Sequence, residues 1–91
     1  MNIPTITSLE NALMIYYKYS EIGNSEIAEL FGKRSSATIS KLKKIVKDEM
    51  IKKDIFSYGS NKINTKIAFI VWGLDVADLE KRSRKLKELN L

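Results

Sequence analysis

The hydrophobic positions in the first fifty residues repeat at helical spacing, in three separate segments. The first segment spans about residues 8–19, the second about residues 25–31, and the third about residues 36–50. Each follows a residue whose side chain can accept a hydrogen bond from the first turn of a helix. We therefore expect three helices in this part of the chain. The residues that can cap them are Thr7, Asn24 or Ser25, and Ser35 or Ser36.

The pattern changes after residue 50. Residues 51–58 alternate between apolar and polar side chains, and residues 63–72 are rich in β-branched and aromatic ones. The two runs are separated by Gly59, Ser60 and Asn61, a sequence typical of a turn. This arrangement predicts a β-hairpin. The second strand is apolar on both faces from Ile67 onward, so we expect its end to be buried on both sides.

The last segment, which begins after Asp75, returns to helical spacing. Its apolar positions recur about every 3.5 residues, as in a short coiled coil. This helix can either fold back on its own domain or pair with a second copy of the chain, and the spacing favours a homodimer. Two positions of this series, Ser83 and Asn90, are polar and weaken the seam. The residues expected at the dimer interface are Val76, Leu79, Ser83, Leu86 and Leu89.

The order of elements is three helices, two strands and a helix, which predicts an α+β protein that is mostly helical. A chain of 91 residues is long enough for one small hydrophobic core. We expect a domain over residues 1–73, followed by a C-terminal helix over residues 74–91 that serves as a dimerisation element.

Basic charge is concentrated in the middle of the chain. The net charge is +5, but residues 33–66 hold ten Lys or Arg against three acidic residues, whereas residues 1–32 carry a net charge of −3. Focused positive charge favours a polyanionic partner, because each cation near a phosphate releases condensed counterions.

Several functional classes are not expected. The chain has no Cys and no His, its carboxylates are scattered, and it has no glycine-rich phosphate loop. We therefore expect neither an enzyme nor a bound cofactor, metal or small-molecule ligand. No signal peptide is visible, and the longest apolar run, Ile67–Trp72, is far shorter than the ~20 residues of a membrane span. A cytoplasmic protein without a membrane partner is expected.

The third predicted helix carries the best candidate for a functional site. If Ile39, Leu42 and Val46 face the core, the opposite face is small, hydroxylated and basic in its first half. Such a face suits the major groove of DNA, where small residues allow close approach and Ser or Lys can reach base edges. Acidic residues follow at positions 48 and 49, so we expect only the first half to enter the groove. Lys43 and Lys47 are expected to be solvated.

Two segments resemble a known class of DNA-binding proteins. Ser25–Gly32 (SEIAELFG) resembles the first helix and turn of bacterial winged-helix regulators. Thr38–Lys44 (TISKLKK) resembles the recognition helix of MarR-type proteins. The resemblance covers about residues 8–72 and implies a winged helix-turn-helix, with the hairpin as the wing. The residues expected at the DNA are Lys33, Arg34, Ser35, Ser36, Ala37, Thr38, Ser40, Lys41, Lys44, Lys62 and Lys66.

These features predict sequence-specific binding of double-stranded DNA. A small transcriptional regulator or a mobile-element accessory protein fits, and a homodimer would read a pseudo-palindromic site. One alternative is a winged-helix protein-interaction module without DNA readout, because a fold alone does not settle function. Another is a binder of RNA or single strands, for which exposed aromatic residues on a sheet would be expected. Tyr16, Tyr17 and Tyr19 could form a stacking platform for a single strand, but we expect Tyr16 and Tyr17 to be core residues of the first helix. On the wing, Lys62 and Lys66 either hold adjacent phosphates or protect an edge strand.

Overall fold

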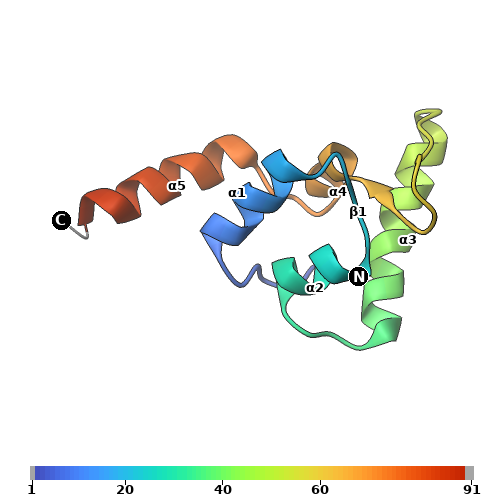
Figure 1. Ribbon diagram of the computed structural model, residues 1–91, viewed down its shortest axis with the longest axis horizontal. Helices are drawn as coiled ribbons and strands as arrows, with labels where there is room; N and C mark the ends of the chain where they lie inside the picture. The colour runs from blue at the N-terminus through green and yellow to red at the C-terminus, as the bar shows by residue number, and fades with distance from the viewer. Residues whose placement is uncertain (1, 90–91) are drawn as a thin grey trace.

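The computed structural model describes residues 2–89, which form a mostly helical α+β protein (Figure 1). Five helices and one two-stranded antiparallel sheet make up the described part of the chain. None of these helices is long and apolar enough to cross a bilayer. The elements in chain order are α1 (Leu9–Lys18), β1 (Glu21–Ile22), α2 (Asn24–Phe31), α3 (Ser36–Lys52), β2 (Ile63–Asn64), α4 (Thr65–Val71) and α5 (Val76–Leu89).

The three helices predicted before residue 50 are present, although two of their caps differ from those expected. Ser35 caps α3 as predicted, because its Oγ accepts a hydrogen bond from the N–H of Thr38 at 3.2 Å. Ser8, and not Thr7, caps α1 by accepting from the N–H of Asn11 at 3.2 Å. Thr7 instead uses its hydroxyl and its N–H to bind the last carbonyls of α2. Helix α2 begins after Gly23, so neither predicted residue is its cap.

The predicted hairpin of residues 51–58 and 63–72 is wrong. Helix α3 continues to Lys52, and β2 pairs with β1 instead, in the register Glu21↔Asn64 and Ile22↔Ile63. The run that follows β2 is helix α4, because Asn64 caps it: its Oδ1 accepts from the N–H of Ile67 at 3.0 Å. A short run that is apolar on every side fits a buried helix as well as a buried strand. The described chain therefore contains no two-stranded wing.

Helix α4 fills the position next to α3 and completes the core. Its Ile67, Ala68 and Phe69 are buried, but Ile70 in the same run is 70% exposed, so the expected burial on both sides is wrong for this position. Trp72 follows directly, and its indole N–H donates to the carbonyl of Leu42 in α3 at 3.2 Å. The Trp72 ring also meets Phe31 of α2 edge-on, with 5.2 Å between centroids. Helix α3 is thus packed against the core on one face, and only its opposite face is open to solvent.

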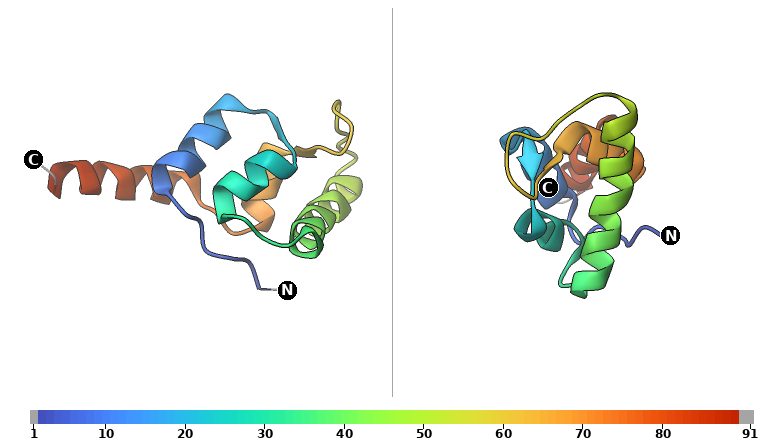
Figure 2. Two further views of the ribbon diagram at one scale, coloured as in Figure 1. Left: turned by 60° about the horizontal axis from the view of Figure 1, so that its bottom comes forward. Right: turned by 90° about the vertical axis from the view of Figure 1, so that its right-hand side faces the viewer.

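Helix α5 packs on its own domain at its beginning and projects away from it at its end (Figures 1 and 2). In its first half, Leu79 is only 7% exposed within the core, and Glu80 accepts a hydrogen bond from the hydroxyl of Tyr17 in α1. In its second half, Leu86 and Leu89 are 49% and 80% exposed. Leu79 therefore lies in the core of its own chain and not in a seam between copies. Asn90, the last position of the predicted series, lies outside the described residues.

Candidate nucleic-acid interface

The outward face of α3 has the composition expected for it. Leu42, Val46 and Met50 are buried and Ile39 is half-buried, which fixes the inward side of the helix. Thr38 is half-buried, and its hydroxyl lies 3.0 Å from that of Ser35 at the helix start. The exposed residues along the first two and a half turns are Ser36, Ala37, Ser40, Lys41 and Lys44.

A four-residue turn joins α2 to α3 and exposes two more cations. Gly32 ends α2 with a φ of 82°, a left-handed backbone that favours glycine. Arg34 donates its Nε–H to the carbonyl of Phe31 at 3.0 Å, so its guanidinium closes the end of α2 while the residue stays exposed. Lys33 and Ser35 are also exposed here. The predicted cluster at the start of α3 is thus brought together beside the free N–H groups of that helix.

The far end of α3 carries two acidic residues, and both are engaged by lysines. Lys44 pairs with Asp48 at 3.2 Å, and Lys53 pairs with Glu49 at 3.8 Å. Both pairs lie one turn apart on the same helix or at its end, where they neutralise each other at the surface. On α3, Lys44 is thus paired, whereas Lys41, Lys47 and Lys52 are exposed and lie outside these two pairs.

Lys43 is buried, so the expectation that it is solvated is wrong. Its ammonium donates to Oδ1 of Asn24 at 3.1 Å and to the backbone carbonyl of Asn61 at 2.5 Å. Burial lowers the pKa of Lys43, and the nearby Lys47 lowers it further. The side chain thus ties α3 to the start of α2 and to the segment after α3. The sequence did carry a signal, since Lys43 lies four residues after Ile39 and three before Val46, on the apolar stripe.

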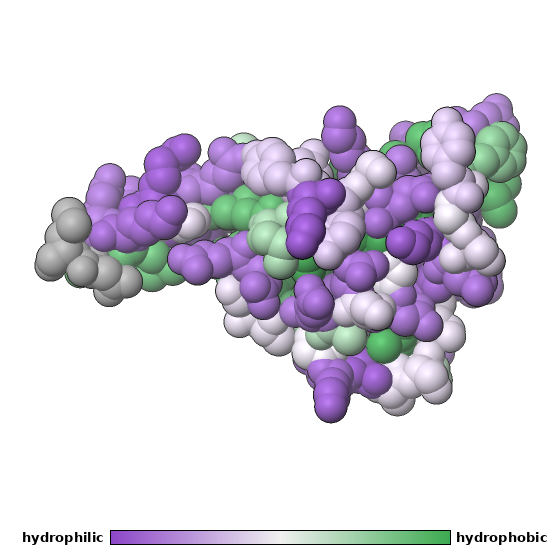
Figure 3. Space-filling view, viewed as in Figure 1, coloured by the Kyte–Doolittle hydropathy of each residue, from purple (hydrophilic) through white to green (hydrophobic). Residues whose placement is uncertain are grey.

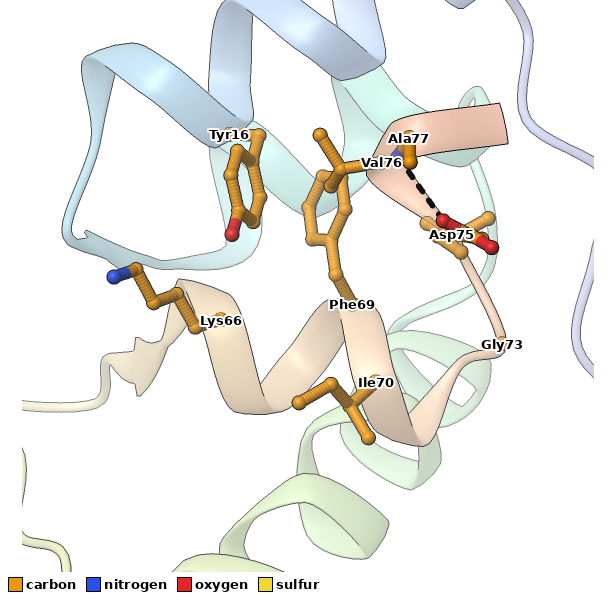
Figure 4. Close-up of a pocket in the computed structure, with 9 residues that line it drawn as sticks. Tyr16, Lys66, Phe69, Ile70, Gly73, Asp75, Val76 and Ala77 are labelled. Atoms are coloured by element: carbon orange, nitrogen blue, oxygen red, sulfur yellow. Dashed lines mark hydrogen bonds between the residues drawn. The ribbon is translucent and has the colours of Figure 1, made fainter. Parts of the chain in front are cut away.

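Lys62 and Lys66, which were predicted to lie on a wing, are both exposed, but they do not lie on one strand. Lys62 lies against Gly23 and Gly59. A Cβ at Gly59 would come within 2.9 Å of the Lys62 Cδ, and one at Gly23 within 3.8 Å of its Cγ. Lys66 lies on α4, next to a hollow between α1, α4 and the start of α5 (Figure 4). No residue of α3 lines that hollow. Lys66 is therefore on a different surface from the exposed side of α3.

The hollow beside Lys66 is lined by one of the tyrosines at the end of α1. It has a volume of about 490 Å³, and Tyr16, Phe69 and Val76 face one another across it (Figure 4). Tyr16 is half-buried, with its ring 5.0 Å from that of Phe69, and Tyr17 is tied to Glu80. Tyr19 is half-buried under the ammonium of Lys18. Tyr17 is 66% exposed, so the expectation that it packs in the core is wrong, whereas Tyr16 and Tyr19 are half-buried. The three tyrosines line a common hollow of about 890 Å³.

Between α3 and β2 lies a structured loop that the sequence did not predict, which we call the 53–62 loop. In Figure 2 (right) it leaves the end of α3 and crosses to β1. The carboxylate of Glu21 accepts from the N–H groups of Tyr58 and Gly59, at 2.7 Å and 2.9 Å. Phe56 is 79% exposed on this loop, and Tyr58 is fully exposed. The segment thus holds two aromatic rings in solvent on a backbone fixed by hydrogen bonds.

The exposed side of α3 continues into this loop. A hollow of about 570 Å³ runs along Ser40, Lys44 and Lys47 of α3 to Asn61 of the loop. A smaller one of about 240 Å³ lies next to it and is also lined by Lys47, together with Phe56. Hydrophobic surface gathers at this end of α3, at the upper right of Figure 3. These two adjacent hollows therefore lead from Ser40 of α3 to Phe56.

Comparison with known proteins returns no match to a family model, to a curated protein or to a solved structure. The likeness of residues 8–72 to MarR-type regulators therefore stays a prediction from the sequence.

Proposed function

We propose that this protein binds double-stranded DNA in a sequence-specific manner through the first half of α3. In this proposal α2, the turn at residues 32–35 and α3 form a helix-turn-helix, and α3 is the recognition helix. The observation that carries it is the exposed face of Ala37, Ser40 and Lys41, which is small, hydroxylated and basic and is backed by a buried apolar face.

The chemistry of this face suits the major groove. Ala37 and Ser40 allow the backbone of α3 to approach the base edges closely, and the Ser40 hydroxyl can donate or accept there. Lys41 can reach guanine acceptors or a phosphate. Lys33, Arg34 and Ser36 surround the start of α3, where backbone N–H groups attract phosphate. Base readout and phosphate anchoring thus fall on adjacent residues.

The acidic end of α3 sets the depth of the contact. Asp48 is paired with Lys44 at the surface, and Glu49 is paired with Lys53. A paired carboxylate still gives no attraction for phosphate, so the second half of α3 should leave the groove. We therefore assign base readout to residues 37–41 and place residues 44–52 at the flank of the site.

A second copy of the chain would extend the site. The last turns of α5 project from the domain with Leu86 and Leu89 exposed on one side, and we propose that this end pairs with another copy. Two recognition helices about 34 Å apart would then read a pseudo-palindromic site, as small transcriptional regulators and mobile-element accessory proteins do. The fold in this proposal is a winged-helix relative whose wing is replaced by the 53–62 loop.

Titration of labelled duplex DNA with the protein at several salt concentrations tests the proposal. Mixed-sequence duplex should bind at low salt, and the logarithm of the affinity should fall with that of salt by about 0.9 per phosphate contact. A selection from random duplexes should then enrich a defined motif. If no duplex binds at low salt, the proposal is overturned and the alternative of a protein-docking module stands.

A further inference from the structure

We propose that Phe56 of the 53–62 loop acts as a wedge that enters the minor groove beside the α3 site and unstacks a base step, which bends the DNA. This inference rests on the proposed binding of duplex DNA and names an additional activity for the same surface. It assigns a role to the ring of Phe56, which lies outside the hydrophobic core.

The exposure of Phe56 calls for a partner. A phenylalanine that is 79% exposed leaves most of an apolar ring in water, and Ile51 next to it at the end of α3 is 69% exposed. Contiguous apolar surface of this kind marks an interaction site more often than a structural need. Proteins that bend DNA commonly use Phe, Leu or Ile as the group inserted between base pairs.

The loop is built to hold the ring in place. Two of its N–H groups are fixed by the Glu21 carboxylate, and the hydroxyl of Ser57 donates to the carbonyl of Lys62 at 2.5 Å. Asp54 and Asn61 take left-handed backbone, with φ of 54° and 60°, so the chain turns sharply at both ends. A wedge must resist being pushed back by the base pairs it separates, and a loop with these bonds can do so.

The loop is also coupled in position to α3. Lys43 in the middle of α3 holds the carbonyl of Asn61 and the side chain of Asn24, and Ile55 donates its N–H to the carbonyl of Met50 at 2.9 Å. Seating α3 in the major groove therefore also positions Phe56. Because the hollow along α3 and the one beside Phe56 share Lys47 and Ile51, DNA that lies on α3 continues toward the ring.

Charge around the loop favours DNA over a neutral partner. Lys47 and Lys62 are exposed and line the hollow beside Phe56. The carboxylate of Glu21 is occupied by two backbone N–H groups, and Glu49 is paired with Lys53. Asp54 is the acidic residue of the loop itself, and together with Glu21 it lines the hollow on the other side of Phe56, away from Lys47. Phosphates on the edge of a minor groove nearest α3 would therefore meet lysines beside the apolar tip.

Fluorescent duplexes test the wedge directly. The probe is a duplex enriched by the wild-type protein, or a mixed-sequence duplex if none is enriched, with 2-aminopurine placed in turn at each flanking position. A second duplex carries a donor and an acceptor dye at its two ends. Wild-type protein should raise 2-aminopurine fluorescence at one step beside the α3 site and shorten the distance between the ends. Phe56→Ala should lose both signals and bind roughly 10-fold more weakly.

Two comparisons make the result specific. Ile70→Ala removes an apolar side chain that is 70% exposed on α4, in the hollow that Lys66 also lines, and should change neither signal. Phe56→Leu should keep part of both, because an aliphatic wedge can still separate bases. Circular dichroism should show that every variant keeps its helices, since Phe56 lies outside the core.

The outcomes separate this inference from the proposed function. If wild-type protein binds duplex without changing either signal, or if Phe56→Ala bends DNA as wild type does, the wedge is overturned while DNA binding stands. If Phe56→Ala binds DNA normally but loses capture of a protein partner, the loop is a protein-docking site and the wedge is again overturned. If wild-type protein binds no duplex, both proposals fall together.

Discussion

The ammonium of Lys43 lies 2.5 Å from the backbone carbonyl of Asn61, which joins the middle of α3 to the far end of the 53–62 loop. The same ammonium donates to Asn24 at the start of α2. One buried cation thus connects three separate segments on the side of the molecule that we assign to DNA. Its stem packs on the apolar stripe of α3 while its head reaches polar partners, as lysines at the edge of a core do.

Replacing Lys43 should therefore destabilise the fold. Lys43→Met keeps the apolar stem and removes the two hydrogen bonds, and we expect a loss of about 1–3 kcal/mol in the free energy of unfolding. Lys43→Ala should cost more, because the stem is lost as well. Urea unfolding measures both. A melting curve for Lys43→Met that matches wild type would show that these hydrogen bonds do not stabilise the fold.

Substitutions on the buried face of α3 should lower stability strongly, whereas those on its exposed face should change it little. Leu42 is fully buried, and Leu42→Ala should cost about 2–5 kcal/mol, enough to unfold so small a domain. Lys41, its exposed neighbour, should tolerate alanine within about 0.5 kcal/mol. Thermal melts rank the two. If Lys41→Ala were the more damaging change, the assignment of the two faces would be reversed.

The parts of the fold that depend on helical spacing could be predicted from the sequence. The three helices before residue 50 and the outward face of α3 follow from the 100° step between residues, so Ala37, Ser40 and Lys41 were placed correctly. This information is local, and the tertiary structure did not override it.

The parts that depend on distant contacts could not be predicted. The run Ile67–Trp72 has the composition of a buried strand, and it becomes a helix because Asn64 caps it and Trp72 binds Leu42, 30 residues away. Lys43 finds Asn61 only after the loop has folded, 18 residues along the chain. Leu79 has the spacing of a coiled-coil seam, but it is buried in the core of its own chain, where α5 packs against α1. In each case the deciding partner lies outside the window over which a pattern is read.

Tyr17 should make the docking of α5 on α1 sensitive to alkaline pH. The hydrogen bond that its hydroxyl gives to Glu80 raises the pKa of Tyr17 above its ordinary value of 10.0. A pKa raised by folding stabilises the folded state at pH below 10, and this contribution is lost as pH rises through the higher pKa. Tyr17→Phe should abolish the dependence. Tyrosine absorbance during a pH titration of both proteins measures the pKa of Tyr17. If Tyr17 ionises at the same pH as the other tyrosines, the prediction is contradicted.

Lys41 and Lys62 should affect DNA binding in different ways. Lys41→Ala should relax the preference at particular base pairs of an enriched motif, by about 1–3 kcal/mol for a good base contact. Lys62→Ala, at the end of the loop, should weaken binding to all duplexes alike and flatten the salt dependence by about one contact. Lys81→Ala removes the same charge from α5 and is the matched control. A motif that survives Lys41→Ala unchanged would show that α3 is turned differently in the groove.

The exposed end of α5 should decide whether two copies act together. Leu86 and Leu89 lie beyond the region that α1 covers, so Leu86→Asp with Leu89→Asp should leave the fold intact. If the two leucines pair with a second copy, burying unpaired carboxylates there is costly, and the double variant should be a folded monomer. It should keep weak binding to a single half-site and lose the gain that two linked half-sites give.

A third substitution separates loss of pairing from loss of folding. Leu79→Asp places a carboxylate in the core of its own chain, where 7% of the side chain is exposed, and should unfold the protein instead of splitting a dimer. Light scattering reports the mass of each variant and circular dichroism its helix content. A wild-type protein that stays monomeric at high concentration would end the dimer hypothesis. Recognition would then depend on one copy of α3 together with the 53–62 loop, and the enriched motif should lack two-fold symmetry.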